Sequence, residues 1–130
     1  MRMLWLVSGV VLVASLSMSP WAVSRAQDAA PGQTVDVAAE RFSFTPSEIR
    51  TTVGTVLTIR LTSDDTAHGF RIVGSDVNIE IPKRSRGTAT VTFTPEKAGR
   101  YTFECSKLCG AGHSFMRGEI IATEAPKGGQ

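Results

Sequence analysis

The sequence predicts an all-β domain, a β-sandwich, that follows an N-terminal targeting segment. Apolar and polar residues alternate with a period of two over residues 57–62 (LTIRLT) and 88–94 (TATVTFT), with threonine on the polar side. This alternation is typical of strands in a sheet that is buried on one face. Turn residues recur at intervals of about 8 to 12 residues, as they do in β-sandwiches. No helical stripe is present after residue 26.

The remaining strands are expected between clusters of turn-forming residues. Turn signals include Pro46, Gly54, the Asp64-Asp65 pair and Gly74, which favour bends over continued strand. Between them, we expect strands over residues 34–39, 48–53, 69–73, 77–81, 100–105 and 118–123. Because no internal repeat is present and the length suits one core, we expect a single domain over residues 34–124.

The two ends of the chain differ from this domain. The first 26 residues have the layout of a secretory signal, with basic Arg2, an apolar run and small residues before a cleavage site after Ala26. The alternative is an uncleaved membrane anchor, since the apolar run is just long enough to cross a bilayer. Either segment would place the domain outside the cytoplasm. Residues 27–33 are expected to be a flexible linker and residues 125–130 a flexible tail.

The charge of the exported part excludes one class of partner. Removing residues 1–26 takes away Arg2 and Arg25, so the 14 basic residues fall to 12 and equal the 12 acidic ones. A neutral domain offers no electrostatic footprint for nucleic acid, and we expect none to bind. Contact with a membrane is expected only through the N-terminal segment, if that segment is uncleaved.

Five side chains of the exported part form a candidate metal-binding set. Cys105, Cys109, His113 and Met116 lie within twelve residues, and His68 follows the Asp64-Asp65 turn. Thiolate, thioether and imidazole ligands together select copper over magnesium, calcium or manganese. The set therefore predicts a copper site.

Four interpretations of this set remain open on the residues alone. The two cysteines form a disulfide in the first, although the ring closed by Cys105 and Cys109 is very small. A mononuclear blue-copper site would use Cys109, His113, Met116 and His68 and leave Cys105 unexplained. A zinc site would use both cysteines and both histidines and leave Met116 idle. A centre with two copper ions and bridging thiolates uses all five side chains.

The segment CSKLCGAGHSFM over residues 105–116 closely resembles the dinuclear copper A (CuA) loop of cytochrome c oxidase subunit II, with its pattern C-x-E-x-C-G-x-x-H-x-x-M. Residues 65–70 (DTAHGF) are similar to the segment that holds the family's first histidine. The resemblance covers roughly residues 34–123. It implies a Greek-key β-sandwich of the cupredoxin type.

The resemblance also implies a set of ligands for two copper ions. Cys105 and Cys109 would bridge the two ions. His68 and the Met116 thioether would complete one ion, and His113 and the main-chain carbonyl of Lys107 the other. The family has Glu where this chain has Lys107, but the ligand there is a backbone oxygen, so we expect the copper site to persist and the family's interfacial magnesium ion to be missing.

The implied function is electron transfer outside the cytoplasm, in the periplasm for a bacterial protein. The protein would accept single electrons from a cytochrome c or similar donor and pass them to the catalytic subunit of a terminal oxidase or to another acceptor. No catalytic activity is expected from this chain alone. The exported part has no tryptophan for a donor patch, and Tyr101 is expected in the core. The alternative functions are copper storage or delivery to an oxidase, or electron transfer by a mononuclear blue-copper carrier.

Overall fold

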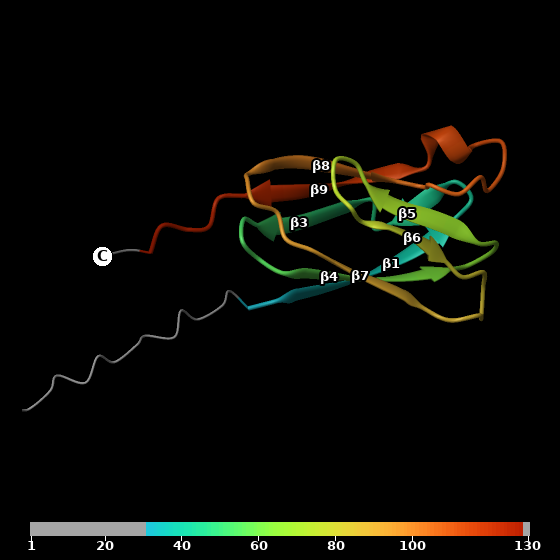
Figure 1. Ribbon diagram of the computed structural model, residues 1–130, viewed down its shortest axis with the longest axis horizontal. Helices are drawn as coiled ribbons and strands as arrows, with labels where there is room; N and C mark the ends of the chain where they lie inside the picture. Colours follow the sequence, from blue (N-terminus) through green and yellow to red (C-terminus); the bar gives the residue numbers. More distant parts are fainter. Residues whose placement is uncertain (1–30, 129–130) are drawn as a thin grey trace, which may run out of the picture.

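Two β-sheets pack face to face in the computed structural model, which describes residues 31–128 (Figure 1). One sheet has the strand order β2-β1-β4-β7 and the other β3-β9-β8-β5-β6. The elements are β1 (Gln33–Glu40), β2 (Ser43–Thr45), β3 (Glu48–Thr52), β4 (Leu57–Ser63), β5 (His68–Ile72), β6 (Asn78–Ile81), β7 (Ala89–Phe93), β8 (Gly99–Glu104), the 3₁₀ turn η1 (His113–Phe115) and β9 (Arg117–Thr123).

Both sheets are mixed. Strand β1 runs parallel to β4, and β3 runs parallel to β9, whereas the other neighbours are antiparallel. The chain passes repeatedly from one sheet to the other, so the loops gather at the two ends of the sandwich. Both ends of the described chain leave at one end, and η1 lies at the other (Figure 1).

The prediction of an all-β sandwich is confirmed, and each of the eight expected strands is present within one or two residues at its ends. The three-residue strand β2 (Ser43–Thr45) was not expected, because it is too short to show alternation and is followed at once by Pro46. The expected signal or anchor segment lies outside the described residues. Within residues 31–128, no helix has the length and apolar character needed to cross a membrane.

The alternating pattern of β4 explains how the sandwich is held together. Leu57, Ile59 and Leu61 are fully buried between the sheets, while Arg60 between them is exposed. Burying each such side chain contributes about 1.5 to 3 kcal/mol. Tyr101 of β8 is only partly buried and packs against the edge of this core, where its ring meets Phe93 with 5.1 Å between ring centroids, so it lies at the margin of the core and not inside it.

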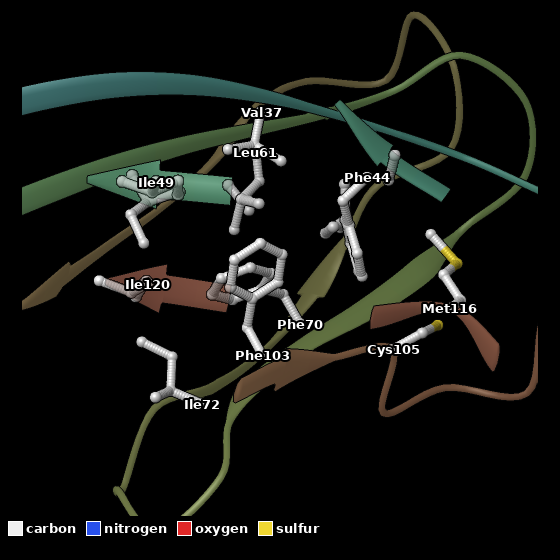
Figure 2. Close-up of a cluster of buried hydrophobic side chains, with 14 of the residues drawn as sticks. Val37, Phe44, Ile49, Leu61, Phe70, Ile72, Phe103, Cys105, Met116 and Ile120 are labelled. Carbon is white, nitrogen blue, oxygen red and sulfur yellow. The ribbon is translucent and has the colours of Figure 1, made fainter. Parts of the chain in front are cut away.

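Three phenylalanines from three strands form the part of the core nearest the candidate site. Phe44, Phe70 and Phe103 pack with ring centroids 5.1 to 5.8 Å apart. Figure 2 shows Cys105 and Met116 beside this cluster, with their sulfur atoms on its far side from Ile72. Cys105 and Met116 therefore pack against a cluster of three buried phenylalanine rings.

Candidate metal centre

The two cysteine sulfurs form the middle of the site. Cys105 directly follows β8, and Cys109 lies four residues later in the segment 105–116, which we call the metal loop. Their Sγ atoms are 3.7 Å apart, and each residue is only 5% exposed. Both are free cysteines, so the disulfide interpretation is wrong for this structure. The separation is less than twice a metal–thiolate bond of about 2.3 Å, so a metal ion has room to contact both sulfurs.

The two histidines approach the sulfur pair from different elements. His68 is the first residue of β5 and is fully buried, with its Nδ1 4.0 Å from the Sγ of Cys105. His113 begins η1 and is half-buried, with its Nδ1 3.8 Å from the Sγ of Cys109. Each sulfur therefore has its own imidazole nitrogen, and one imidazole is closer to solvent than the other.

Two weaker donors complete the set that the sequence predicts. The main-chain oxygen of Lys107 lies 3.1 Å from the Sγ of Cys105. The Sδ of Met116, which is 1% exposed, lies 3.8 Å from the Sγ of Cys109. The structure thus brings all six predicted donors together at one end of the sandwich. The ligand atoms of His68, Cys105 and Cys109 lie within 4.8 Å of one another.

Backbone contacts define the shape of the metal loop. The N–H of Cys105 donates to the carbonyl of Met116 at 3.0 Å, which closes the loop where β8 and β9 diverge. A side chain at Gly112 would place its Cβ 2.2 Å from the ring of Phe42, so only glycine lets the loop lie against that ring. A Cβ at Gly69 would lie 2.6 Å from the backbone nitrogen of Lys107. Glycine at these two positions lets the loop approach β5 and the segment after β1.

Asp65 orients the buried histidine, a role that the sequence analysis did not assign. Its Oδ1 lies 2.7 Å from the Nε2 of His68, which leaves Nδ1 directed at the sulfurs. Carboxylates commonly hold metal-binding histidines in this way. Burial raises the pKa of Asp65, but hydrogen bonds from His68 and from the N–H groups of Thr66 and Arg41 outweigh burial and keep the pKa below 3.8. The only sequence signal for this role is the position of Asp65 three residues before His68, and the Asp64-Asp65 pair indicates a turn just as well.

Arg41 joins Asp65 to the metal loop. Its backbone N–H donates to the Oδ2 of Asp65 at 3.1 Å, and its Nε donates to the carbonyl of Cys109 at 2.9 Å. One residue thus connects the partner of one candidate ligand to the backbone of another. No sequence pattern points to Arg41, because its contacts span 24 and 68 positions along the chain.

The outer side of the metal loop is attached to edge strand β6. The Nζ of Lys107 lies 2.9 Å from a carboxylate oxygen of Glu80, and the hydroxyl of Ser106 donates to the side-chain oxygen of Asn78 at 2.7 Å. Lys107 and Glu80 are both exposed, so their ion pair contributes at most about 1 kcal/mol. These contacts hold the carbonyl of Lys107 toward the sulfurs.

The thiol of Cys109 is held in its neutral form without metal. Burial, followed by the hydrogen bond and the charge of neighbouring Cys105, raises its pKa to about 11 from 9.0. Because a metal ligand must be a thiolate, metal binding has to displace this proton. A buried pair of soft donors with two imidazoles and a thioether fits copper, and Met116 would have no use in a zinc site.

Comparison with known proteins gives the same family from sequence and from structure. A family model described as a cupredoxin-like domain matches residues 10–122. Cytochrome c oxidase subunit 2 of Thermus thermophilus is 33% identical over 108 residues, which cover 81% of this chain and 78% of the relative.

Two solved structures share the fold. One chain of a heme-copper terminal oxidase dimer superposes with a TM-score of 0.62 and 30% identity, over 70% of this chain and 65% of that chain. The periplasmic domain of subunit II of cytochrome oxidase from Bradyrhizobium japonicum superposes with a TM-score of 0.64 over 71% of this chain and 84% of that chain, at 20% identity, and shows the fold alone.

Proposed function

The chain belongs to the cytochrome c oxidase subunit II family of cupredoxin-like domains, and from this premise we propose that it is an electron-transfer protein with a dinuclear copper centre. The observation that supports the proposal best is the pair of buried sulfurs 3.7 Å apart, with an imidazole nitrogen at 4.0 Å from one and 3.8 Å from the other. A mononuclear site would leave one sulfur without a role.

Each candidate ligand has a role in this proposal. Cys105 and Cys109 would bridge two copper ions, His68 and Met116 would complete one, and His113 and the carbonyl of Lys107 the other. All six donors lie near the two sulfurs, and the resemblance to the CuA loop supports this division of ligands between the two ions. Bound copper would supply reversible one-electron redox chemistry.

The surrounding chain favours fast electron transfer over chemistry on a substrate. His68 lies in β5, and Met116 directly precedes β9; both are buried, which limits movement of these ligands when the redox state changes. The Asp65 carboxylate holds the His68 ring in one orientation. Ligands that are held by strands and hydrogen bonds in this way lower the reorganisation that accompanies electron transfer.

The surface near His113 is the proposed place where redox partners approach. Leu108 and Phe115 of the metal loop are 80% and 79% exposed, and Phe42 lies against the loop beside Gly112. Exposed apolar side chains beside a metal ligand are typical of a protein interface. We propose a cytochrome c or similar protein as donor and a terminal oxidase catalytic subunit or another acceptor on the other side.

The proposed location is outside the cytoplasm. The relatives and the signal-like N-terminal segment favour export, with residues 1–26 as a cleaved signal or a retained anchor, residues 27–33 as a linker and residues 34–124 as the copper domain. Whether the protein works as an oxidase subunit or as a freestanding carrier follows from the fate of that segment. Mass spectrometry of the mature N-terminus, with a membrane-fraction assay, distinguishes the two.

Copper storage or delivery is the less favoured function. A delivery protein needs a site that releases its ion easily, whereas His68, both cysteines and Met116 are each at most 5% exposed. The rate of copper transfer to a strong chelator separates the two functions. Slow transfer, over hours, is expected for the carrier.

Copper stoichiometry with electron paramagnetic resonance tests the central proposal. Purified protein, reduced and then loaded with copper, is expected to hold two copper ions per chain, to turn purple and to show hyperfine splitting from two equivalent nuclei. One copper ion per chain with splitting from a single nucleus would refute the dinuclear centre.

A further inference from the structure

The loop between β6 and β7 carries three positive side chains that have no ion-pair partner within residues 31–128. Lys83, Arg84 and Arg86 lie within four residues and are all exposed, and we call residues 82–88 the basic loop. Of the twelve lysines and arginines in residues 31–128, six take part in ion pairs, and these three are half of the other six.

The basic loop belongs to the copper end of the sandwich. Ile81, the last residue of β6, pairs with His68 in the sheet, so the loop begins directly beside a candidate ligand. The backbone N–H of Arg84 donates to the carbonyl of Asp65 at 3.1 Å, and Asp65 in turn bonds His68. Figure 1 shows the β6–β7 connection at the same end as η1.

The loop has a defined shape that presents these charges. The N–H of Arg86 donates to the carbonyl of Lys83 at 3.0 Å, which closes a tight turn. Asp65, which accepts from Arg84 of this loop, also accepts from Arg41, and Arg41 donates to the carbonyl of Cys109. A continuous set of hydrogen bonds therefore links the basic loop to the metal loop.

We infer that the basic loop is the docking contact for a redox partner with an acidic surface. This inference rests on the proposed electron-transfer function and names the kind of partner. Three cations that have no ion-pair partner among residues 31–128 lie at the same end of the sandwich as the candidate centre. They attract a protein that has carboxylates around its own redox group and repel one that has lysines there. With copper held by the candidate ligands, the exchange would move one electron from the reduced redox group of the partner, which becomes oxidised, to the oxidised copper, and no bond would form or break.

A protein partner fits these observations better than a lipid surface. The described chain begins and ends at the opposite end of the sandwich, so the basic loop faces away from both of its ends (Figure 1). The same loop is joined through Asp65 to His68, a candidate ligand. This connection brings a docked protein close to the candidate centre, as electron exchange requires, whereas lipid binding does not require it.

Stopped-flow electron transfer with two forms of one cytochrome tests the inference. The probes are native mitochondrial cytochrome c, which is basic, and the same cytochrome with succinylated lysines, which is acidic. The full-length, copper-loaded chain is compared with Lys83→Glu/Arg84→Glu/Arg86→Glu and with the control Lys97→Glu. Lys97 is also exposed and unpaired among the described residues, but it lies in the β7–β8 connection at the far end.

The expected rate constant with the acidic cytochrome is high at low ionic strength and falls as salt is added. The triple variant should lose about tenfold or more of that rate and gain rate with the native cytochrome, and Lys97→Glu should change neither by more than about twofold. If the triple Glu variant does not fold, a triple Gln variant replaces it. The salt dependence of the rate is then compared between the Gln variant and the unaltered protein, and it should be weaker in the Gln variant.

Three outcomes would overturn the inference. The first is an unchanged rate with the acidic cytochrome in the triple variant, and the second is an equal loss in Lys97→Glu. The third is unchanged rates together with loss of binding to vesicles that contain phosphatidylglycerol, which would assign the loop to a lipid surface. Reduction by hexaammineruthenium(II) separates these results from failure of the proposed function, since a protein that this small reductant cannot reduce has no working redox centre.

Discussion

Replacing Asp65 by Asn tests whether the carboxylate positions His68 for metal binding. The change keeps the size of the side chain but removes its charge. In the unaltered protein the two carboxylate oxygens lie 2.7 Å from the Nε2 of His68 and 3.1 Å from the backbone nitrogen of Arg41. In Asp65→Asn an NH₂ group replaces one of these two oxygens. In either orientation of the amide, its NH₂ group faces an N–H donor, of His68 or of Arg41, and one hydrogen bond is lost. Loss of such a partner weakens metal affinity by about 10- to 100-fold, or about 1.4 to 2.8 kcal/mol.

Competition with a chromophoric Cu(I) chelator measures this affinity directly. The matched control is Asp64→Asn, because Asp64 is an exposed neighbour whose side chain has no hydrogen-bond or ion-pair partner among the described residues. For Asp64→Asn, the free energy of unfolding and the free energy of copper binding should each stay within about 0.5 kcal/mol of the values for the unaltered protein. Copper affinity of Asp65→Asn equal to that of the control would refute the positioning role.

Four further predictions concern the metal loop and its supports. Cys105→Ser should abolish the purple centre and leave at most one copper ion in a blue site; a purple spectrum in this variant would contradict bridging by both sulfurs. Lys107→Glu should leave the copper spectrum nearly unchanged, because the ligand is a backbone oxygen, while repulsion from Glu80 lowers the free energy of unfolding by less than about 1 kcal/mol, and adding Glu80→Lys should restore it; loss of the centre would show that the side chain matters. Gly69→Ala should cost about 1 to 3 kcal/mol in urea unfolding and alter the copper spectrum, since the new methyl group forces the backbone of Lys107 to move, and an unchanged spectrum would argue against that contact. Copper affinity should rise with pH between about 6 and 8, because the proton held by Cys109 with a pKa of about 11 must leave, and calorimetry in buffers of different ionisation enthalpy should detect its release; pH-independent binding would contradict this.

The Cys109 thiol also sets the sign of a stability change in the metal-free protein. Its pKa is higher in the folded chain than the ordinary value of 9.0, so the unfolded chain loses this proton first as the pH rises. The contribution to stability is therefore complete below about pH 9 and is lost as the pH approaches about 11. Chemical unfolding of the metal-free protein at several alkaline pH values, with Cys109→Ser as the control, measures this loss.

Much of the fold and most of the ligand set follow from local sequence. Strand β4 could be predicted because Leu57, Ile59 and Leu61 alternate with polar residues, and burial between sheets requires that period. Four of the predicted ligand side chains lie within twelve residues, so a single compact turn is enough to bring them together. His68 could be added because copper chemistry needs a second imidazole and the chain has only one other histidine.

The supports of the site could not be predicted, for a physical reason. Arg41 reaches Cys109 across 68 positions, and Lys107 reaches Glu80 across 27. Such contacts depend on which strands and loops the fold brings side by side, and period and propensity carry no information about that arrangement. The parallel pairing of β1 with β4 and of β3 with β9 could not be predicted for the same reason.

The closure of the metal loop by the Cys105–Met116 hydrogen bond has a consequence for the thermodynamics of folding. Every candidate donor except His68 lies within this one hairpin connection, so the unfolded chain keeps most of them close together. Copper will therefore bind the unfolded chain as well, and ligand binding stabilises a fold only by the difference in affinity between the two states. Copper should therefore raise the melting temperature by less than its affinity for the folded protein alone implies. The size of the rise that remains measures how much affinity His68 and the folded sandwich add to the donors of the metal loop.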